Sequence, residues 1–330
     1  MRRLFAALSL LIAVAGAAHW VVPAGRGALA MLLAQEDPAR LADLQLDAAL
    51  DATRVAAEIE AALAADDAEL AASFVALADA RGLGVVPAQR ARVAVESQPA
   101  AQALRGAGHF GRGLVTGQAD DAASLAGATL GDLTVWGDVR DAGRQAWRWA
   151  KGEEVDRLML GLSAAGIAAT GATYAAFGAP LTLRAGLSLA KGARRTGALG
   201  VRLADDLAAL VARGGTRGAL RFAGDLGTVQ SKAGTRATLA GLRHIDTAAD
   251  SARLRRLADV KGGQTLAILK TLGRGALFVT EVLAKLAFWV LAAAFNLIGL
   301  IASLNATVVA LVRPLWRGGA GRLGSAFAAL

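Results

Sequence analysis

Three long runs without a charged residue constrain the fold of this 330-residue chain more than any other feature. They are Leu4–Gly25, Leu158–Leu183 and Leu286–Val312, with 22, 26 and 27 residues. Chance rarely produces such gaps when charged residues make up 19% of a chain. Because a bilayer-spanning helix needs about 20 predominantly apolar residues, the sequence predicts an all-α integral membrane protein with soluble helical segments on both sides of the membrane.

The first uncharged run has two interpretations. Two arginines at positions 2–3 precede an apolar stretch, 4–18, which contains small residues at 15–17. This order is typical of a cleaved signal peptide. The apolar stretch also continues through Val22, which makes it long enough to remain as a signal anchor. Residues 1–22 are therefore expected to be a signal peptide or a signal-anchor helix, and either would export the residues that follow.

The charges are distributed unevenly between the runs. Residues 23–157 hold 13 basic and 20 acidic side chains, whereas residues 181–275 hold 17 basic and 6 acidic. Because loops rich in Lys and Arg stay in the cytoplasm, the sequence predicts that residues 23–157 are periplasmic and residues 181–275 cytoplasmic, around a bacterial inner (cytoplasmic) membrane. The preference for Arg over Lys, 30 to 6, is typical of a GC-rich bacterial genome.

The C-terminal apolar region also allows two arrangements. Between 276 and 312 the only charged residues are Glu281 and Lys285, spaced for an ion pair on one helix face. This region could form one long tilted span, or a hairpin of two helices with a turn near Asn296. The arginines at 313, 317 and 322 favour the hairpin, because that arrangement returns them to the cytoplasm.

These observations divide the chain into seven predicted segments. They are a signal peptide or signal anchor (1–22), an acidic periplasmic helical domain (23–105), a Gly-rich linker with a membrane-interface helix (106–157), a transmembrane helix (158–180), a basic cytoplasmic domain of amphipathic helices (181–275), a transmembrane hairpin or single long span (276–312) and a basic tail (313–330).

Local signals place the helices of the acidic segment. Asp37-Pro38 is an N-cap followed by proline at the first helical position. Asp66 and Glu69 resemble a capping box, and Gly82 is expected to end the helix that they begin. Apolar residues at helical spacing predict one buried face: Leu41, Leu44, Ala48, Val55, Ile59 and Leu63. Pro87 and Pro99 are expected to begin two shorter helices.

Two features predict contacts with lipid. Trp147 and Trp149, beside Arg148 and Lys151, have the composition of a membrane-interface anchor. The basic segment after Pro180 has leucines at helical spacing between cations, which favours binding to anionic lipid headgroups. Its single aromatic residue, Phe222, provides no base-stacking platform, so no nucleic-acid partner is predicted.

The second uncharged run is rich in small residues, which allow two helix backbones to approach closely in lipid. We therefore expect a helix contact there, within the chain or in a homo-oligomer. The residues that would form it are Gly161, Ala165, Gly166, Thr170, Gly171 and Ala175. The protein partner, if one exists, is not identified by any motif.

The sequence predicts no catalytic residue, no cofactor and no metal site. The three histidines, His19, His109 and His244, lack the spacing of a zinc motif, and the chain has no cysteine. The glycines in 106–117 match the letters of a dinucleotide fingerprint, but that motif must follow a strand and open a helix, whereas here it follows a predicted helix.

Residues 111–204 resemble a segment of uncharacterised proteobacterial integral membrane proteins. The resemblance rests on GDLTVWGDVRDAGRQAWRWAKGEEVDRLMLGLSAAGIAATGATYA and on LRAGLSLAKGARRTG. The first of these stretches is also similar to linker segments of bacterial polymorphic toxins. Neither resemblance implies an activity or a functional residue.

Amphipathic helices on both sides of a membrane and small-residue helix contacts together favour a non-enzymatic inner-membrane scaffold or interaction protein. A channel or pore-forming element is the alternative, built from the second run and the C-terminal hairpin. A membrane-bound enzyme is the third possibility.

Overall fold

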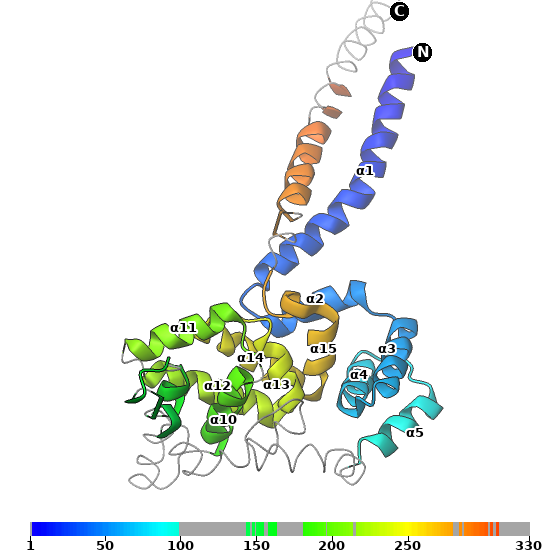
Figure 1. The fold of residues 1–330 in the computed structure, drawn as a ribbon. Helices are drawn as coiled ribbons and strands as arrows, with labels where there is room; N and C mark the ends of the chain where they lie inside the picture. Colours follow the sequence, from blue (N-terminus) through cyan, green and yellow to red (C-terminus); the bar gives the residue numbers. More distant parts are fainter. Residues whose placement is uncertain are drawn as a thin grey trace, which may run out of the picture. The chain divides into compact units, whose positions relative to one another are not determined.

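Every regular element that the structure describes is a helix, which confirms the all-α prediction (Figure 1). The computed structural model describes residues 2–98, 181–195, 197–213 and 216–279, together with parts of 143–163 and of 284–309. The chain divides into a terminal unit, Met1–Gln35 with Val279–Leu330, and a central unit, Glu36–Phe278.

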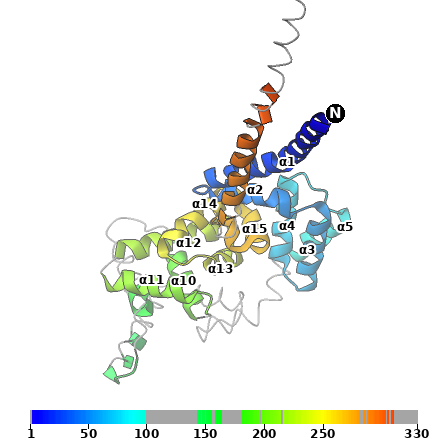
Figure 2. The ribbon, with the colours of Figure 1, turned by 90° about the horizontal axis from the view of Figure 1, so that it is seen from above.

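The terminal unit pairs the two ends of the chain. Helix α1 (Arg2–Leu33) continues through Pro23. Residues 23–33, which the sequence assigned to the acidic domain, are therefore part of this helix. A Cβ added at Gly25 would lie 3.7 Å from Cβ of Ala294 and 3.9 Å from Cγ1 of Val290. These are ordinary van der Waals distances, so α1 and the C-terminal helix lie side by side at this point (Figures 1 and 2).

The predicted turn near Asn296 is wrong. Residues 287–302 form an uninterrupted helix. The Asn296 side-chain amide donates a hydrogen bond of 3.0 Å to the carbonyl of Ala292, one turn earlier in the same helix. Because this bond satisfies the amide within the helix, Asn296 does not need to break it. The described helix therefore continues through the position of the predicted turn.

The central unit consists of short helices joined by tight turns. In chain order, outside the intervening residues 99–180, they are α2 (Pro38–Ala49), α3 (Ala52–Ala64), α4 (Ala68–Ala80), α5 (Pro87–Glu96), α10 (Leu181–Arg195), α11 (Val201–Ala212), α12 (Thr216–Ala233), α13 (Thr235–Leu242), η1 (Ala248–Asp250), α14 (Ser251–Lys261), η2 (Gly262–Gln264), α15 (Thr265–Leu272) and η3 (Gly273–Ala276).

Local capping chemistry sets the starts of the first helices. The Asp37 carboxylate accepts hydrogen bonds from the backbone N–H groups of Ala39 and Arg40, which confirms the predicted start of α2. Asp51 caps α3 in the same way, so the predicted apolar face is divided between two helices. The N-cap of α4 is Asp67 and not Asp66, because the Asp67 carboxylate reaches the N–H of Leu70.

Gly82 ends α4 as predicted. Its φ of +65° lies in the left-handed region that glycine adopts without steric cost. The N–H of Leu83 donates to the carbonyl of Ala78, and the N–H of Gly82 to that of Asp79. These two bonds form a Schellman motif, which satisfies the last carbonyls of the helix.

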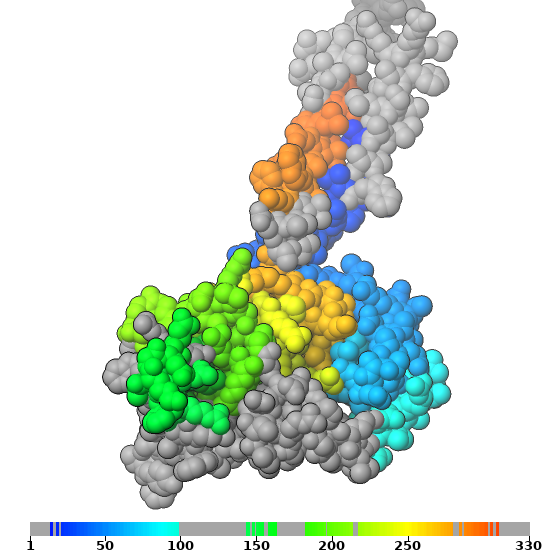
Figure 3. Space-filling view, viewed as in Figure 1, coloured from blue at the N-terminus to red at the C-terminus, as the bar shows by residue number. Residues whose placement is uncertain are grey.

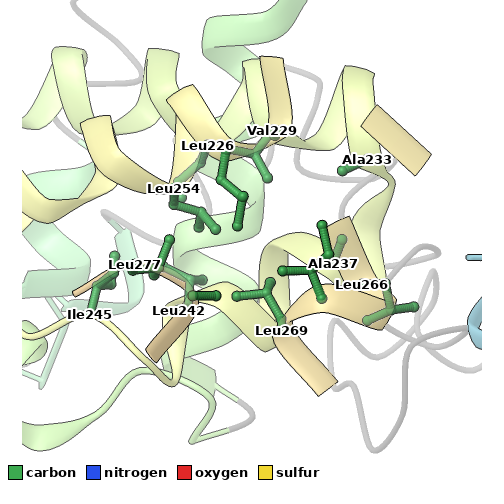
Figure 4. Close-up of a cluster of buried hydrophobic side chains, with 14 of the residues drawn as sticks. Leu226, Val229, Ala233, Ala237, Leu242, Ile245, Leu254, Leu266, Leu269 and Leu277 are labelled. Carbon is green, nitrogen blue, oxygen red and sulfur yellow. The ribbon is translucent and has the colours of Figure 1, made fainter. Parts of the chain in front are cut away.

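Two lobes share the core of the central unit. The acidic lobe is residues 36–98, and the basic lobe is residues 181–278. Leu46 and Phe74 of the acidic lobe belong to the same buried cluster as Leu254 and Ile268 of the basic lobe. Figure 4 shows basic-lobe members of this cluster, and Figure 3 shows the acidic-lobe helices (lighter blue) directly beside the yellow-to-orange helices of the basic lobe. The two segments that the sequence predicts as separate domains therefore share one core in the structure.

Ion pairs join the lobes within the described part of the chain, and in the three named here the acid comes from the acidic lobe. They join Glu36 to Arg253 (2.8 Å), Asp43 to Lys261 (2.6 Å) and Asp67 to Arg236 (2.7 Å). The acidic lobe holds 12 acidic and 5 basic residues, against 6 and 17 in the basic lobe. The charge difference that predicted a membrane between the two segments thus belongs to two complementary surfaces in contact.

The tightest helix crossing joins α10 to α12 within the basic lobe. A Cβ at Gly186 would overlap the carbonyl oxygen of Ala223, and a Cβ at Gly227 would overlap that of Thr182. Lys191 of α10 is 1% exposed, so this part of the helix is packed within the basic lobe. Two glycines outside the second uncharged run thus allow the backbones of α10 and α12 to approach closely.

The start of that second run also lies in the core. Leu158 and Leu162 are 3% and 0% exposed and belong to the buried cluster of the central unit. A Cβ at Gly161 would overlap the side chain of Val211 in α11. Residues 158–163, predicted as the start of a transmembrane helix, therefore pack against the basic lobe in the described structure. Residues 164–180 lie outside the described part of the chain.

The α10–α12 crossing can be tested with two glycines of α12. In Gly227→Ala the new methyl group meets the Thr182 carbonyl, so we expect a loss of about 1–3 kcal/mol in the free energy of unfolding, or failure to fold. Gly224→Ala is the matched control, since nothing lies within 4 Å of its Cβ position. It should be neutral or stabilising by up to about 1 kcal/mol. Chemical denaturation followed by circular dichroism measures both, and equal losses would contradict the crossing.

Candidate functional site

Large apolar side chains are exposed on the C-terminal helix of the terminal unit. Phe288, Trp289, Phe295 and Ile298 are 66%, 70%, 74% and 62% exposed. Within the described residues, no helix combines the length and the apolar character required to cross a membrane. The described helix 287–302 nevertheless leaves most of its large apolar side chains without a protein neighbour to cover them.

The exposed side chains cover about half of the circumference of this helix. At about 100° per residue, Phe288, Trp289 and Ile298 point in three directions spread over roughly half of its circumference. The remaining side faces α1, because Val290 and Ala294 lie beside Gly25. This surface therefore lacks the separate polar face of a helix that packs on a protein on one side and contacts water on the other.

Helix α1 has a similar surface where its side chains are described. Val22, Leu29 and Leu33 are exposed by 46%, 47% and 73%. Val14 is buried at 6%. The terminal unit therefore presents apolar surface from both of its helices.

The central unit begins and ends at the same place. Nη2 of Arg253 lies 2.8 Å from Oε1 of Glu36, the first residue of the unit. The same guanidinium lies 5.3 Å from the ring centroid of Phe278, the last residue of the unit. The Arg274 guanidinium approaches that ring to 4.7 Å. We call these four residues the exit clamp.

Hydrogen bonds hold the surroundings of the exit clamp. Arg256 donates to the carbonyl of Glu36 (3.0 Å), and Gln45 donates to the carbonyl of Gly275 (2.6 Å). Arg253 is only 22% exposed at its side chain, so its contacts are less screened by water than those of a surface pair. The clamp therefore fixes where the chain enters and leaves the central unit.

His244 lies beside the exit clamp. The Arg274 guanidinium donates to the carbonyl of His244 (3.4 Å) and forms an ion pair of 2.7 Å with Asp246, which also pairs with Arg202. Burial of the imidazole lowers the pKa of His244, and the positive charges of Arg243 and Arg274 lower it further. The neutral imidazole is therefore the form that this site favours.

A second charged site lies where the lobes meet. Asp43, Asp47, Arg81 and Lys261 line a depression of about 540 Å³. Arg81 pairs with both Asp43 and Asp47, and Lys261 with Asp43. These charges satisfy one another, so the arrangement joins the lobes and does not present a free catalytic group. Among the described residues, no three His, Cys, Asp or Glu side chains could together hold a metal ion.

The structure brings together few of the residues singled out from the sequence. Of the small residues proposed for a helix contact, Gly161 meets Val211 of the same chain, and the other five lie outside the described residues. His109 and Glu281 also lie outside them. Sequence reasoning missed the exit clamp, because Arg253 and Glu36 are 217 positions apart and no local pattern connects them.

No protein-family model, no curated protein and no solved structure matches this chain. The resemblance of residues 111–204 to proteobacterial membrane proteins therefore stays a prediction.

The exit clamp predicts energetic coupling between Arg253 and Phe278. A cation over an aromatic face contributes about 0.5–1 kcal/mol beyond the separate effects of the two residues. In a double-mutant cycle of Arg253→Gln and Phe278→Leu, we expect that coupling in the free energy of unfolding. Arg256→Gln with Phe278→Leu is the control cycle and should show almost none, since Arg256 bonds to the Glu36 carbonyl. Equal coupling in both cycles would contradict the clamp.

The lowered pKa of His244 predicts that acid reduces the stability of the central unit. Its pKa is lower in the folded than in the unfolded chain, so below about pH 6.5 the unfolded state binds more protons. The free energy of unfolding should therefore fall as the pH drops from 7 through 6.5 towards the folded pKa. His244→Gln should lose less stability than the wild type between pH 7 and 5 in urea titrations. Parallel pH profiles would show that His244 does not contribute.

Proposed function

We propose that this protein is a bacterial inner-membrane scaffold or interaction protein that holds its central unit at a membrane surface by two inserted terminal arms. The observation that carries the proposal is the exit clamp. Because Arg253 contacts both Glu36 and Phe278, the chain enters and leaves the central unit at one point. Both chain ends that continue from there contain a long uncharged run.

Lipid is the partner that suits the arms. A protein partner normally covers one face of a helix, and an apolar patch at such an interface has a polar rim. On helix 287–302 the exposed side chains spread over at least half of the circumference and include no charged residue. An acyl-chain environment covers such a surface without selecting one face.

The lengths of the uncharged runs are compatible with one crossing each. The described helix 287–302 is about 24 Å long, shorter than a hydrocarbon core of about 30 Å. The proposal therefore extends the span over the whole run 286–312, about 40 Å if helical throughout. Residues 4–25 would be about 33 Å long. Each arm is then sufficient for a tilted single span.

Charge at the outer ends of the arms gives the proposed orientation. No acidic residue occurs before Glu36 or after Glu281, whereas arginines occur at 2, 3, 313, 317 and 322. Single crossings from a common exit place all five arginines on the side away from the central unit. The positive-inside rule assigns that side to the cytoplasm. Both lobes are then periplasmic, in place of the division predicted from charge alone.

A scaffold suits the described residues better than a channel. An ion pathway requires polar or ionisable groups at membrane depth. Between 287 and 302 the sequence offers one amide side chain, Asn296, and that amide bonds within its own helix. The charged depression of the central unit is satisfied internally, which gives an enzyme no support either.

The absence of cysteine makes a direct topology test possible. Single cysteines at Ala57 in the acidic lobe, Ala209 in the basic lobe and Ser325 near the C-terminus would report the side of the membrane. Ala57 and Ala209 are exposed on α3 and α11. In spheroplasts treated with a membrane-impermeant maleimide, we expect Ala57→Cys and Ala209→Cys to be labelled, and Ser325→Cys to be labelled only after detergent is added.

Membrane retention during alkaline carbonate extraction is the accompanying control. Labelling of Ala57→Cys without Ala209→Cys would restore the opposite-side arrangement and overturn the shared exit. Labelling of Ser325→Cys in intact spheroplasts would overturn the orientation. Release of the chain by carbonate would overturn the anchoring itself.

A further inference from the structure

We propose that the central unit contains a cleft for a phosphate-bearing anion, formed by Arg144, Arg148, Lys151 and Arg195. The cleft has a volume of about 490 Å³, within the range of small-molecule sites. This proposal does not depend on the membrane anchoring of the chain.

The cleft is built from parts of the chain that are distant in sequence. Arg144 and Arg148 are four positions apart in the region 143–150, so a helix places them on one side. Lys151 follows, and its N–H donates to the carbonyls of Trp147 and Arg148. Arg195 comes from the last turn of α10. Four cations from two regions of the chain therefore line one depression.

The lining favours an anion with more than one negative charge. Among the described residues that line the cleft, four are cationic and one is a carboxylate, Glu153, which lies 3.9 Å from Nε of Arg148. One guanidinium group binds two phosphate oxygens at once through two parallel N–H donors. A phosphate ester or pyrophosphate has this chemistry.

Trp147 adds an apolar wall. It is 65% exposed, and Nζ of Lys151 lies 5.1 Å from the centroid of its ring. Met159, 7% exposed, lines the same cleft from within the central unit. The sequence alone predicted a membrane-interface anchor for this Trp and Lys group. Because Met159 and Arg195 of α10 line the same cleft, Trp147 and Lys151 form one wall of it, and this wall suits the organic part of a phosphate ester.

The test uses the full chain in neutral detergent and isothermal titration with pyrophosphate and with glycerol 3-phosphate. We expect saturable binding with one site per chain. The double variant Arg148→Gln with Lys151→Gln should weaken that binding about tenfold or more, because it removes two charged donors. Arg217→Gln with Arg221→Gln is the matched control: it removes two exposed positive charges from α12 and should change affinity by less than about twofold.

A second arm separates a soluble ligand from a lipid headgroup. Vesicles of phosphatidylcholine with and without phosphatidic acid are floated with the wild type and the two double variants. If only the cleft variant loses binding in the calorimetric titration, the ligand is a soluble phosphate compound. If only the cleft variant loses its preference for vesicles that contain phosphatidic acid, the ligand is a lipid headgroup. Either result supports the cleft. Absence of saturable binding in both arms, or equal losses in the control variant, overturns it. Unchanged circular dichroism of the variants shows that they are folded.

Discussion

The central unit depends on the docking of α4 against the start of α15, and a single hydroxyl lies at the centre of that contact. Ser73 of α4 is 4% exposed, donates to the carbonyl of Gly263 (2.6 Å) and accepts from the N–H of Ala267 (2.9 Å). It therefore satisfies a carbonyl group of η2 and an N–H group in the first turn of α15, both in the other lobe. Phe74 beside it contributes apolar burial to the shared core. Polar pairing and apolar burial thus fix the same register between the lobes.

This docking also determines where the chain ends leave the central unit. With α4 held on α15, α2 lies against α14 and η3, and Gln45 bonds to the carbonyl of Gly275. Glu36 then meets Arg253, whose guanidinium also covers Phe278. The proposed scaffold role follows from this geometry, because two apolar arms that start at one point can enter one leaflet together. A fold with its exits on opposite faces could not present both arms in that way.

Charge segregation in a sequence has two physical explanations that composition cannot separate. One is a membrane between the segments, because cations are retained in the cytoplasm. The other is direct contact, because opposite charges stabilise each other across an interface. The pairs Asp43–Lys261 and Asp67–Arg236 show that the second applies between the two lobes. Their partners are 218 and 169 positions apart, and neither pair forms a pattern in the sequence.

The sequence by itself determined the helices of the described lobes. Asp37-Pro38, Pro87 and Gly82 act on their own neighbours through local hydrogen bonds and fixed backbone angles, so their effects can be derived from adjacent residues. Only the tertiary structure decided which helices pair. The Gly186 and Gly227 crossing, the burial of Leu162 and the exit clamp each depend on surfaces that meet in space after the chain has folded. Apolar periodicity indicates that one face of a helix is buried, but many other helix faces could cover it equally well. The shape and charge of the two surfaces in contact select one of them.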